Sequence, residues 1–164
     1  MARILVTGGA GYIGSHTVVE LMQQGYEVVI VDNFSNSCAD VLDGIAAIVG
    51  VHPAFEQVDC NDAAAMDSVF ANYPDIVGVI HFAASKAVNE SVAQPLMYYR
   101  NNLMSLVTVL EQMKKHDVRN IVFSSSCTVY GQPSAEYLPV DETAPIQKAL
   151  SPYGNTKQIN EDII

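Results

Sequence analysis

The sequence has no tryptophan and only eight basic residues, against 18 acidic ones, so its formal net charge is −10. Nucleic acids and anionic membrane surfaces are bound by clustered lysine and arginine, whereas the basic residues here are scattered. The sequence also lacks an apolar run of the roughly 18 residues that a membrane span requires. The composition therefore argues against nucleic acid or a membrane as a partner.

Cysteine is also scarce. Cys38, Cys60 and Cys127 are far apart and show no metal-type pairing, so we expect no metal site. An odd, unpaired set is typical of a reducing compartment, and residues 1–6 resemble no signal peptide. We therefore expect a cytoplasmic protein in which Cys60 and Cys127 are small, nearly apolar packing residues.

Apolar residues are plentiful, at 49% of 164 residues, which is ample for one core. Short apolar runs alternate with helical patterns. We expect strands at 4–7, 27–32, 55–58, 76–82 and 121–124, and helices at 12–24, 39–49, 62–73, 95–116 and from 151 onward. This alternation predicts an α/β fold with a doubly wound (Rossmann) parallel sheet.

The first expected strand runs directly into a glycine-rich segment, residues 8–14, that opens the first helix. Glycine permits the tight turn, lets the backbone approach a pyrophosphate, and lets the helix sit close to the strand. The helix N-terminus then offers unpaired N–H groups to the phosphates. The segment thus has the form of a dinucleotide-binding loop.

An acidic residue stands where such a loop needs one. Asp32 ends the second expected strand, 18 residues after Gly14, and can accept the adenosine ribose hydroxyls. A carboxylate there would repel a 2′-phosphate, so the sequence predicts NAD rather than NADP. The alternative is an ordinary tight turn followed by a solvated aspartate.

Tyr153 and Lys157 are four residues apart in the last expected helix, which places them on one face. A phenol ordinarily loses its proton near pH 10, and a neighbouring ammonium favours the phenolate, so the pair can act as a base. Alone, such a pair is a common accident. Here residues 124–126, three serines, follow the fifth strand, where ligands of parallel sheets bind, and one of their hydroxyls could bond a substrate oxygen.

Together these motifs resemble the extended short-chain dehydrogenase/reductase family, and within it the sugar-nucleotide 4-epimerases. The resemblance covers residues 2–164 and is carried by the stretches 6–16, 32–37, 81–92, 98–102, 124–131 and 151–154. Small departures are Ala84-Ser85, where those epimerases often have Gly-Leu, and Cys127, which replaces a common alanine.

The resemblance implies a role for each matching position. The residues that would bind NAD are Gly8, Gly11, Tyr12, Ile13, Gly14, Asp32, Asn33, Asn36, Ser37, Asp59, Cys60, Phe82, Ala83, Ala84, Lys86, Asn101, Ser124, Tyr153 and Lys157. The catalytic residues would be Ser126, Tyr153 and Lys157, with Tyr153 as the base. The implied reaction is epimerisation at C4 of a UDP-hexose (UDP-galactose or UDP-glucose) through a transient 4-keto sugar, with NAD kept as a bound cofactor.

The resemblance also implies an incomplete domain. Residues 1–164 would form an NAD-binding Rossmann domain truncated after about five of its six strands, with the substrate domain, which binds the UDP-sugar, beyond the chain end. We expect such a piece to bind NAD without epimerising, and its fifth strand to be a sheet edge. The wide apolar surface of 95–116 predicts a homodimer through this helix and the final one, unless the final helix alone covers it.

Two other functions stay open. One is a further NAD-dependent sugar-nucleotide enzyme, either a uronate epimerase or decarboxylase or a 4,6-dehydratase. Dehydratases place Asp-Glu after a threonine at the end of the fifth strand, and residues 126–128 contain no acid. The other is an NAD-binding module without catalysis, against which the intact Ser126, Tyr153 and Lys157 argue.

Overall fold

The computed structural model describes residues 2–164, and the chain divides into two compact units. Unit 1 contains the residues up to Ala83 together with Ser105–Ser124, and unit 2 contains Ala84–Met104 and Ser125–Ile164. The long helix α5 (Pro95–Lys115) belongs to both, its first half to unit 2 and its second half to unit 1.

Unit 1 is built on a five-stranded parallel sheet in the order β3-β2-β1-β4-β5. The strands are β1 (Arg3–Thr7), β2 (Glu27–Val31), β3 (Ala54–Glu56), β4 (Ile76–His81) and β5 (Asn120–Phe123). β1 occupies the centre, and its Leu5 and Val6 are completely buried, as expected where helices cover both faces of a parallel sheet. The predicted doubly wound α/β fold is confirmed, and β5 lies at one edge as expected.

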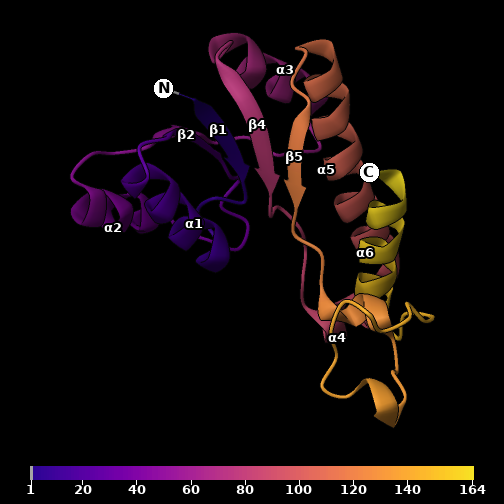
Figure 1. Cartoon of the computed structure of the whole chain (residues 1–164). Coiled ribbons are helices and arrows are strands. Elements are labelled where there is room, and N and C mark those ends of the chain that lie inside the picture. Colours follow the sequence, from indigo (N-terminus) through magenta and orange to yellow (C-terminus); the bar gives the residue numbers. More distant parts are fainter. Residues whose placement is uncertain (1) are drawn as a thin grey trace. The chain divides into compact units, whose positions relative to one another are not determined.

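Helices cover both faces of this sheet (Figure 1). Helices α1 (Tyr12–Gln23) and α2 (Asp40–Val49) pack on one face around the buried Ile30. Helix α3 (Ala63–Asn72) and the second half of α5 pack on the other. The core of that second face contains Leu5, Val29, Val31, Met66, Val69, Phe70, Val79, Val109 and Met113. Both cores lie inside unit 1. The packed sheet therefore holds in place the loops that follow its strands.

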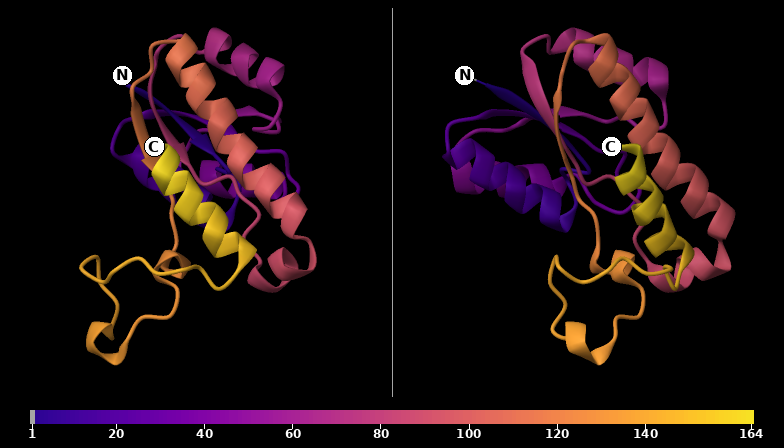
Figure 2. Two further views of the ribbon diagram at one scale, coloured as in Figure 1. Left: turned by 90° about the vertical axis from the view of Figure 1, so that its right-hand side faces the viewer. Right: turned by 45° about the vertical axis from the view of Figure 1, so that its right-hand side comes forward.

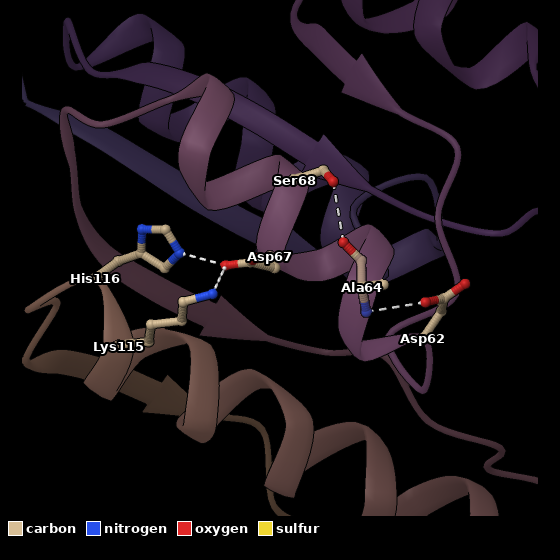
Figure 3. Close-up of polar contacts among 6 residues, drawn as sticks. All are labelled: Asp62, Ala64, Asp67, Ser68, Lys115 and His116. Atoms are coloured by element: carbon tan, nitrogen blue, oxygen red, sulfur yellow. Dashed lines mark hydrogen bonds and ion pairs between the residues drawn. The ribbon is translucent and has the colours of Figure 1, made fainter.

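Two aspartates stabilise helix α3: one caps its N-terminus and the other links it to the end of α5 (Figure 3). The Asp62 carboxylate caps α3, accepting from the backbone N–H of Ala64 and of the next residue at 3.0 Å each. Asp67 accepts hydrogen bonds of 2.8 Å from Lys115 Nζ and His116 Nε2. These two bonds lower the pKa of the Asp67 carboxyl below its ordinary value.

Unit 2 is mostly helical. It contains α4 (Val88–Ala93), the first half of α5, the 3₁₀ turns η1 (Cys127–Tyr130) and η2 (Ala135–Tyr137), and α6 (Pro152–Ile163). Helix α6 packs against α4 and η1. It begins with proline in the first turn after the cap Ser151, whose Oγ accepts from the Gly154 N–H at 3.1 Å. Figure 2 shows 131–150 as an irregular excursion that carries η2 and leads into α6.

Most of the expected elements are confirmed to within one or two residues. Three short elements were not predicted: α4, η1 and η2. Each is six residues or fewer, too short to show a helical period. One burial prediction was wrong: Cys127 is exposed, whereas Cys60 is buried as expected. Within residues 2–164, no helix is both long and apolar enough to cross a membrane.

Candidate functional site

In the glycine-rich segment two positions admit no side chain. Gly8 adopts a φ of +68°, and a Cβ there would lie 2.8 Å from the Ala83 backbone N. A Cβ on Gly14 would overlap the Gly8 carbonyl oxygen. Both obstacles are backbone atoms, which cannot turn aside. The close approach of loop, helix and strand end that the sequence predicted is therefore present.

The N-terminus of α1 is open to a ligand. Gly11 is the N-cap residue, and no side chain caps the helix. The next two residues, Tyr12 and Ile13, have exposed fractions of 77% and 59%. Uncapped N–H groups at the positive end of a helix dipole bind phosphate. An anion of the pyrophosphate type fits this end of α1.

Asp32 joins the glycine-rich segment to the loop that follows β2. Its Oδ2 accepts from the Ala10 N–H at 3.1 Å, and its Oδ1 accepts from the Phe34 N–H and from Ser37 Oγ, both at 2.9 Å. A carboxylate oxygen has two lone pairs, so Oδ2 retains one for a ligand hydroxyl. Asn36, in the same loop, is exposed.

Asp59, after β3, carries the next group of contacts. Its Oδ2 accepts from Asn33 Nδ2 at 3.1 Å, and its Oδ1 accepts from the N–H and the side chain of Asn61. Partial burial raises the pKa of the Asp59 carboxyl, but these hydrogen bonds outweigh that effect and lower the pKa below its ordinary value. Burial, together with the charges of Asp59 and Asp32, raises the pKa of the Cys60 thiol to about 12. A negative carboxylate thus stands beside a neutral thiol.

Two buried polar residues of unit 1 are in contact at the ends of neighbouring strands. Thr7 and His81 end the neighbouring strands β1 and β4, and both are buried. Thr7 Oγ1 lies 2.7 Å from His81 Nδ1, and the backbone N–H of Ala83 donates to the same hydroxyl at 3.5 Å. The contact joins the last residues of β1 and β4. In the sequence, this contact is indicated only by a polar residue at the end of each of the two apolar strands.

In unit 2, α6 presents Tyr153 and Lys157 together. Lys157 is only 3% exposed, and its Nζ lies 5.9 Å from the centroid of the Tyr153 ring. Burial lowers the pKa of Lys157 to about 8, while the charge of Glu161 acts in the opposite direction. Tyr153 and Lys157 therefore lie on one face of α6, as predicted. The pKa of the Lys157 ammonium, about 8, is close to neutral pH.

Tyr98 of α5 supports this pair. Its ring is edge-on to Tyr153, with 6.5 Å between the centroids and an interplanar angle of 83°. The Tyr98 hydroxyl donates to Glu90 Oε2 at 2.7 Å. Burial and the bond to Glu90 raise the pKa of Tyr98 to about 12. Tyr98 therefore stays uncharged and packs against the ring of Tyr153.

Ser126 caps the turn η1, which packs on α6. Its Oγ accepts from Thr128 Oγ1 at 3.0 Å and from the Thr128 N–H at 3.3 Å. With both lone pairs engaged, the Ser126 hydroxyl is left to act as a donor. That is the polarity needed to bond a substrate oxygen.

The loop after β4 is held by an asparagine that the sequence reading did not single out. Asn102 is 1% exposed; its Nδ2 donates to the Ser85 carbonyl at 2.9 Å, and its Oδ1 accepts from the Ser85 N–H at 2.8 Å. Asn102 Nδ2 also lies 3.2 Å from Thr156 Oγ1 on α6, and Asn101 Nδ2 donates to Ser85 Oγ at 3.1 Å. The signal for Asn102 in the sequence is an amide four residues from both Tyr98 and Leu106, on the buried face of a long helix.

The expected residues therefore form two clusters, one in each unit. Unit 1 joins Gly8 to Ala83, the glycine-rich segment to Asp32 and Ser37, and Asn33 to Asp59. It also contains Gly11, Tyr12, Ile13, Gly14, Asn36, Cys60, Phe82 and Ser124. Unit 2 contains Ala84, Lys86, Asn101, Ser126, Tyr153 and Lys157. Lys86 is exposed on the loop after β4.

Comparison with known proteins gives consistent matches. The family model described as the NAD dependent epimerase/dehydratase family matches residues 4–164. The UDP-glucose 4-epimerases of Bacillus subtilis and Homo sapiens are 53% and 48% identical to the chain, over 98% and 99% of it and over 46% and 47% of their own lengths.

A solved structure agrees with these matches. The crystal structure of a UDP-glucose 4-epimerase from Bifidobacterium longum in complex with NAD+ and UDP superposes with a TM-score of 0.95 at 47% identity, covering 99% of this chain and 48% of that one. The chain thus spans about half the length of the relatives that it matches.

Proposed function

We propose that this chain, which belongs to the NAD dependent epimerase/dehydratase family, is the NAD-binding domain, residues 1–164, of a UDP-hexose 4-epimerase. The relatives that match nearly the whole chain at 46–53% identity include UDP-glucose 4-epimerases from bacteria, fungi and mammals. The chain also carries the polar groups that this chemistry needs.

NAD fits the residues present in unit 1. The glycine-rich segment leaves room where a Cβ would collide with backbone, and the end of α1 is uncapped. We assign the pyrophosphate to Gly8, Gly11, Tyr12, Ile13 and Gly14. The adenosine ribose goes to the free lone pair of Asp32, helped by Asn33, Asn36 and Ser37, and the adenine lies between Asp59 and Cys60. The other cofactor contacts are Phe82, Ala83, Ala84, Lys86, Asn101, Ser124, Tyr153 and Lys157.

The catalytic assignment rests on one observation above all, the buried cation of Lys157 beside Tyr153. The positive charge favours the phenolate of Tyr153, which takes the proton from the C4 hydroxyl of the sugar. Ser126 donates to that same oxygen. NAD, when bound, supplies the acceptor and later the donor of the C4 hydride. The epimer would form when C4 receives hydrogen on the opposite face of the 4-keto sugar and Tyr153 returns the proton to the C4 oxygen.

The proposed partners are a UDP-sugar and a second copy of the chain. The exposed residues Leu96 and Met104 lie eight apart on α5, with exposed fractions of 82% and 47%, and they belong to one helical stripe. We propose that the homodimer forms through this stripe of α5 and through α6. We place the protein in the cytoplasm, because its three cysteines are unpaired and two of them are exposed.

The first test is NAD binding to residues 1–164, measured by calorimetry. We expect binding, and we expect Asp32→Ala to abolish it because the variant loses both the ribose acceptor and the bond to Ala10. Ser134→Ala, an exposed change in the loop of unit 2, is the control and keeps full affinity. A wild-type chain that is folded by circular dichroism yet binds no NAD would contradict the assignment.

The second test is turnover. We propose that a counterpart of the half present in the relatives is needed for epimerisation, so residues 1–164 alone should leave UDP-galactose unchanged. Joined to that half, the protein should interconvert UDP-galactose and UDP-glucose. Tyr153→Phe should lose activity by about 10²–10⁴-fold, the usual contribution of an acid–base group, with NAD still bound. A 4-keto-6-deoxy product would instead identify a dehydratase.

A further inference from the structure

One carboxylate near the catalytic pair has no role in the mechanism above. Glu161 lies on α6 four residues beyond Lys157, hence on the same face of the helix. It is half-buried, and its Oε1 accepts a hydrogen bond from Ser125 Oγ. Ser125 immediately precedes the proposed catalytic residue Ser126, so the Glu161 carboxylate is held by the neighbour of a catalytic residue.

The position of Glu161 matters because Lys157 is buried. Removal from water disfavours the ammonium, and a carboxylate nearby favours it. Burial is the larger effect and brings the pKa of Lys157 down to about 8, and Glu161 opposes that fall. Because the pKa stays at about 8, Lys157 is mostly charged near neutrality. Without Glu161 the balance moves toward the neutral amine.

No other carboxylate in unit 2 is placed to do this. The titratable and charged groups on the parts of unit 2 packed against α6 are Glu90 of α4, Tyr98, Tyr99 and the exposed Arg100 of α5, and Cys127 and Tyr130 of η1. The remaining carboxylates of unit 2 outside α6, Glu136, Asp141 and Glu142, are exposed. Glu90 is bonded to the Tyr98 hydroxyl. Tyr99 donates to Asn155 Oδ1 at 2.7 Å. On α6 itself, Asp162 is exposed and lies on another face, about 140° around the helix from Lys157.

We propose that Glu161 is a positioning residue whose carboxylate, held by Ser125, keeps Lys157 in its charged form. This rests on the proposed function, in which the Lys157 ammonium favours the phenolate of Tyr153. Glu161 therefore acts on the reaction through Lys157 and does not touch the sugar. Ser125 acts one step further back, since it only orients Glu161.

The direct test is the titration of Lys157, followed by NMR of ¹³Cε-labelled lysine and assigned with Lys157→Met. We expect a midpoint near 8 in the wild type. Glu161→Gln has the same shape and can still accept from Ser125, but it lacks the charge; its midpoint should fall by about one pH unit, a tenfold change in proton affinity. Ser125→Ala should give a smaller fall. Glu161→Asp keeps the charge and should stay nearer the wild type.

The matched control is Asp162→Asn, which removes one negative charge from the next position of the same helix. Its midpoint should equal that of the wild type. Equal midpoints in Glu161→Gln and Asp162→Asn would overturn the proposal, and so would a Glu161→Asp midpoint as low as that of Glu161→Gln. The readout needs no turnover. A shifted midpoint would thus support the role of Glu161 even if the chain, joined to a counterpart of the relatives' other half, failed to convert UDP-galactose, a failure that would count against the proposed function alone.

The pH dependence of kcat is the second readout. Loss of Lys157 charge sets the alkaline limit, so Glu161→Gln should move this limit to lower pH and depress kcat most above neutrality. A purely structural role would lower kcat by one factor at every pH. Such a uniform loss would contradict the proposal.

Discussion

At the scale of single residues, burial favours the neutral form of two ionisable groups. The thiol of Cys60 has its pKa raised to about 12, and the ammonium of Lys157 has its pKa lowered to about 8. Cys60 is left far from any pH at which it ionises, and the thiolate is the reactive form of cysteine. Lys157 is left near its midpoint, where one nearby carboxylate decides its charge. Burial thus keeps the Cys60 thiol unreactive, and it makes the charge of Lys157 depend on its surroundings near neutral pH.

The three cysteines should therefore react unequally with a thiol reagent. At pH 8, Cys38 and Cys127 are exposed and should react with an aromatic disulfide within minutes, whereas Cys60 should react only after unfolding. Absorbance should report two thiols in the native protein and three in denaturant. Cys60→Ser should leave the native count at two. A native count of three would show that the region around Asp59 opens.

A methyl group on Gly14 should disrupt the dinucleotide loop. Because its Cβ would overlap the Gly8 carbonyl oxygen, Gly14→Ala should cost at least about 1–3 kcal/mol in unfolding free energy and weaken NAD binding by tenfold or more. The measurements are urea unfolding and calorimetry. Gly44→Ala is the control: Gly44 lies inside α2 with nothing within 4 Å of its Cβ position. It should stabilise the protein by about 0.5–1 kcal/mol and leave NAD binding unchanged.

At the scale of elements, long periodic segments were predictable from the sequence. The helices α1, α3, α5 and α6 begin at recognisable signals, such as the carboxylate cap Asp62 and the proline-led start after Ser151. Helix α4 and the two 3₁₀ turns carry no such period.

The same contrast holds for the candidate site. Its motif residues were visible because each motif is local in the chain. The bonds Thr7–His81, Asn102–Ser85 and Ser125–Glu161 were not, because each joins residues 17 or more positions apart. Only the folded chain brings such residues together.

The contact of α3 with the end of α5 should depend on pH. Hydrogen bonds from Lys115 and His116 lower the pKa of Asp67, so the stability they confer is present above the ordinary value of 3.8 and is lost as the pH falls below it. Asp67→Asn should be less stable than the wild type at pH 7 by a small margin, because the pair is exposed. The difference should vanish at acid pH.

Urea unfolding on both sides of pH 3.8 measures this difference. Glu111→Gln, which removes one exposed negative charge from α5, is the control and should show no such pH dependence. An Asp67→Asn deficit that persists at low pH would mean that the variant disturbs packing and not the ion pair.

At the scale of the whole molecule, two surfaces could join copies of the chain. One is the stripe on α5 that contains Leu96 and Met104, and the other is the β5 edge, where Val122 has an exposed fraction of 61%. Unpaired strand edges associate through backbone hydrogen bonds, whereas helical stripes associate through apolar side chains. The two modes respond to different substitutions.

The homodimer proposed above should be broken by a charge on the helix stripe. Sedimentation equilibrium should show a dimer for the wild type and a monomer for Met104→Lys. Val122→Lys places the same charge on the β5 edge and should leave the dimer intact. The reverse outcome would assign the association to the sheet edge, and a monomeric wild type would remove the homodimer from the proposal.

The order of the strands also governs how the chain acquires its structure during synthesis. β1 is made first, yet it ends in the middle of the sheet, between β2 and β4. Once Val31 has been added, β1 can pair on one side, but its other side has no partner until His81 is in place. At about 5–20 residues per second of translation, that interval lasts several seconds. β1, whose Leu5 and Val6 are completely buried in the folded protein, is thus an open edge of the nascent chain throughout that interval, and a chaperone that covers residues 1–81 would protect it.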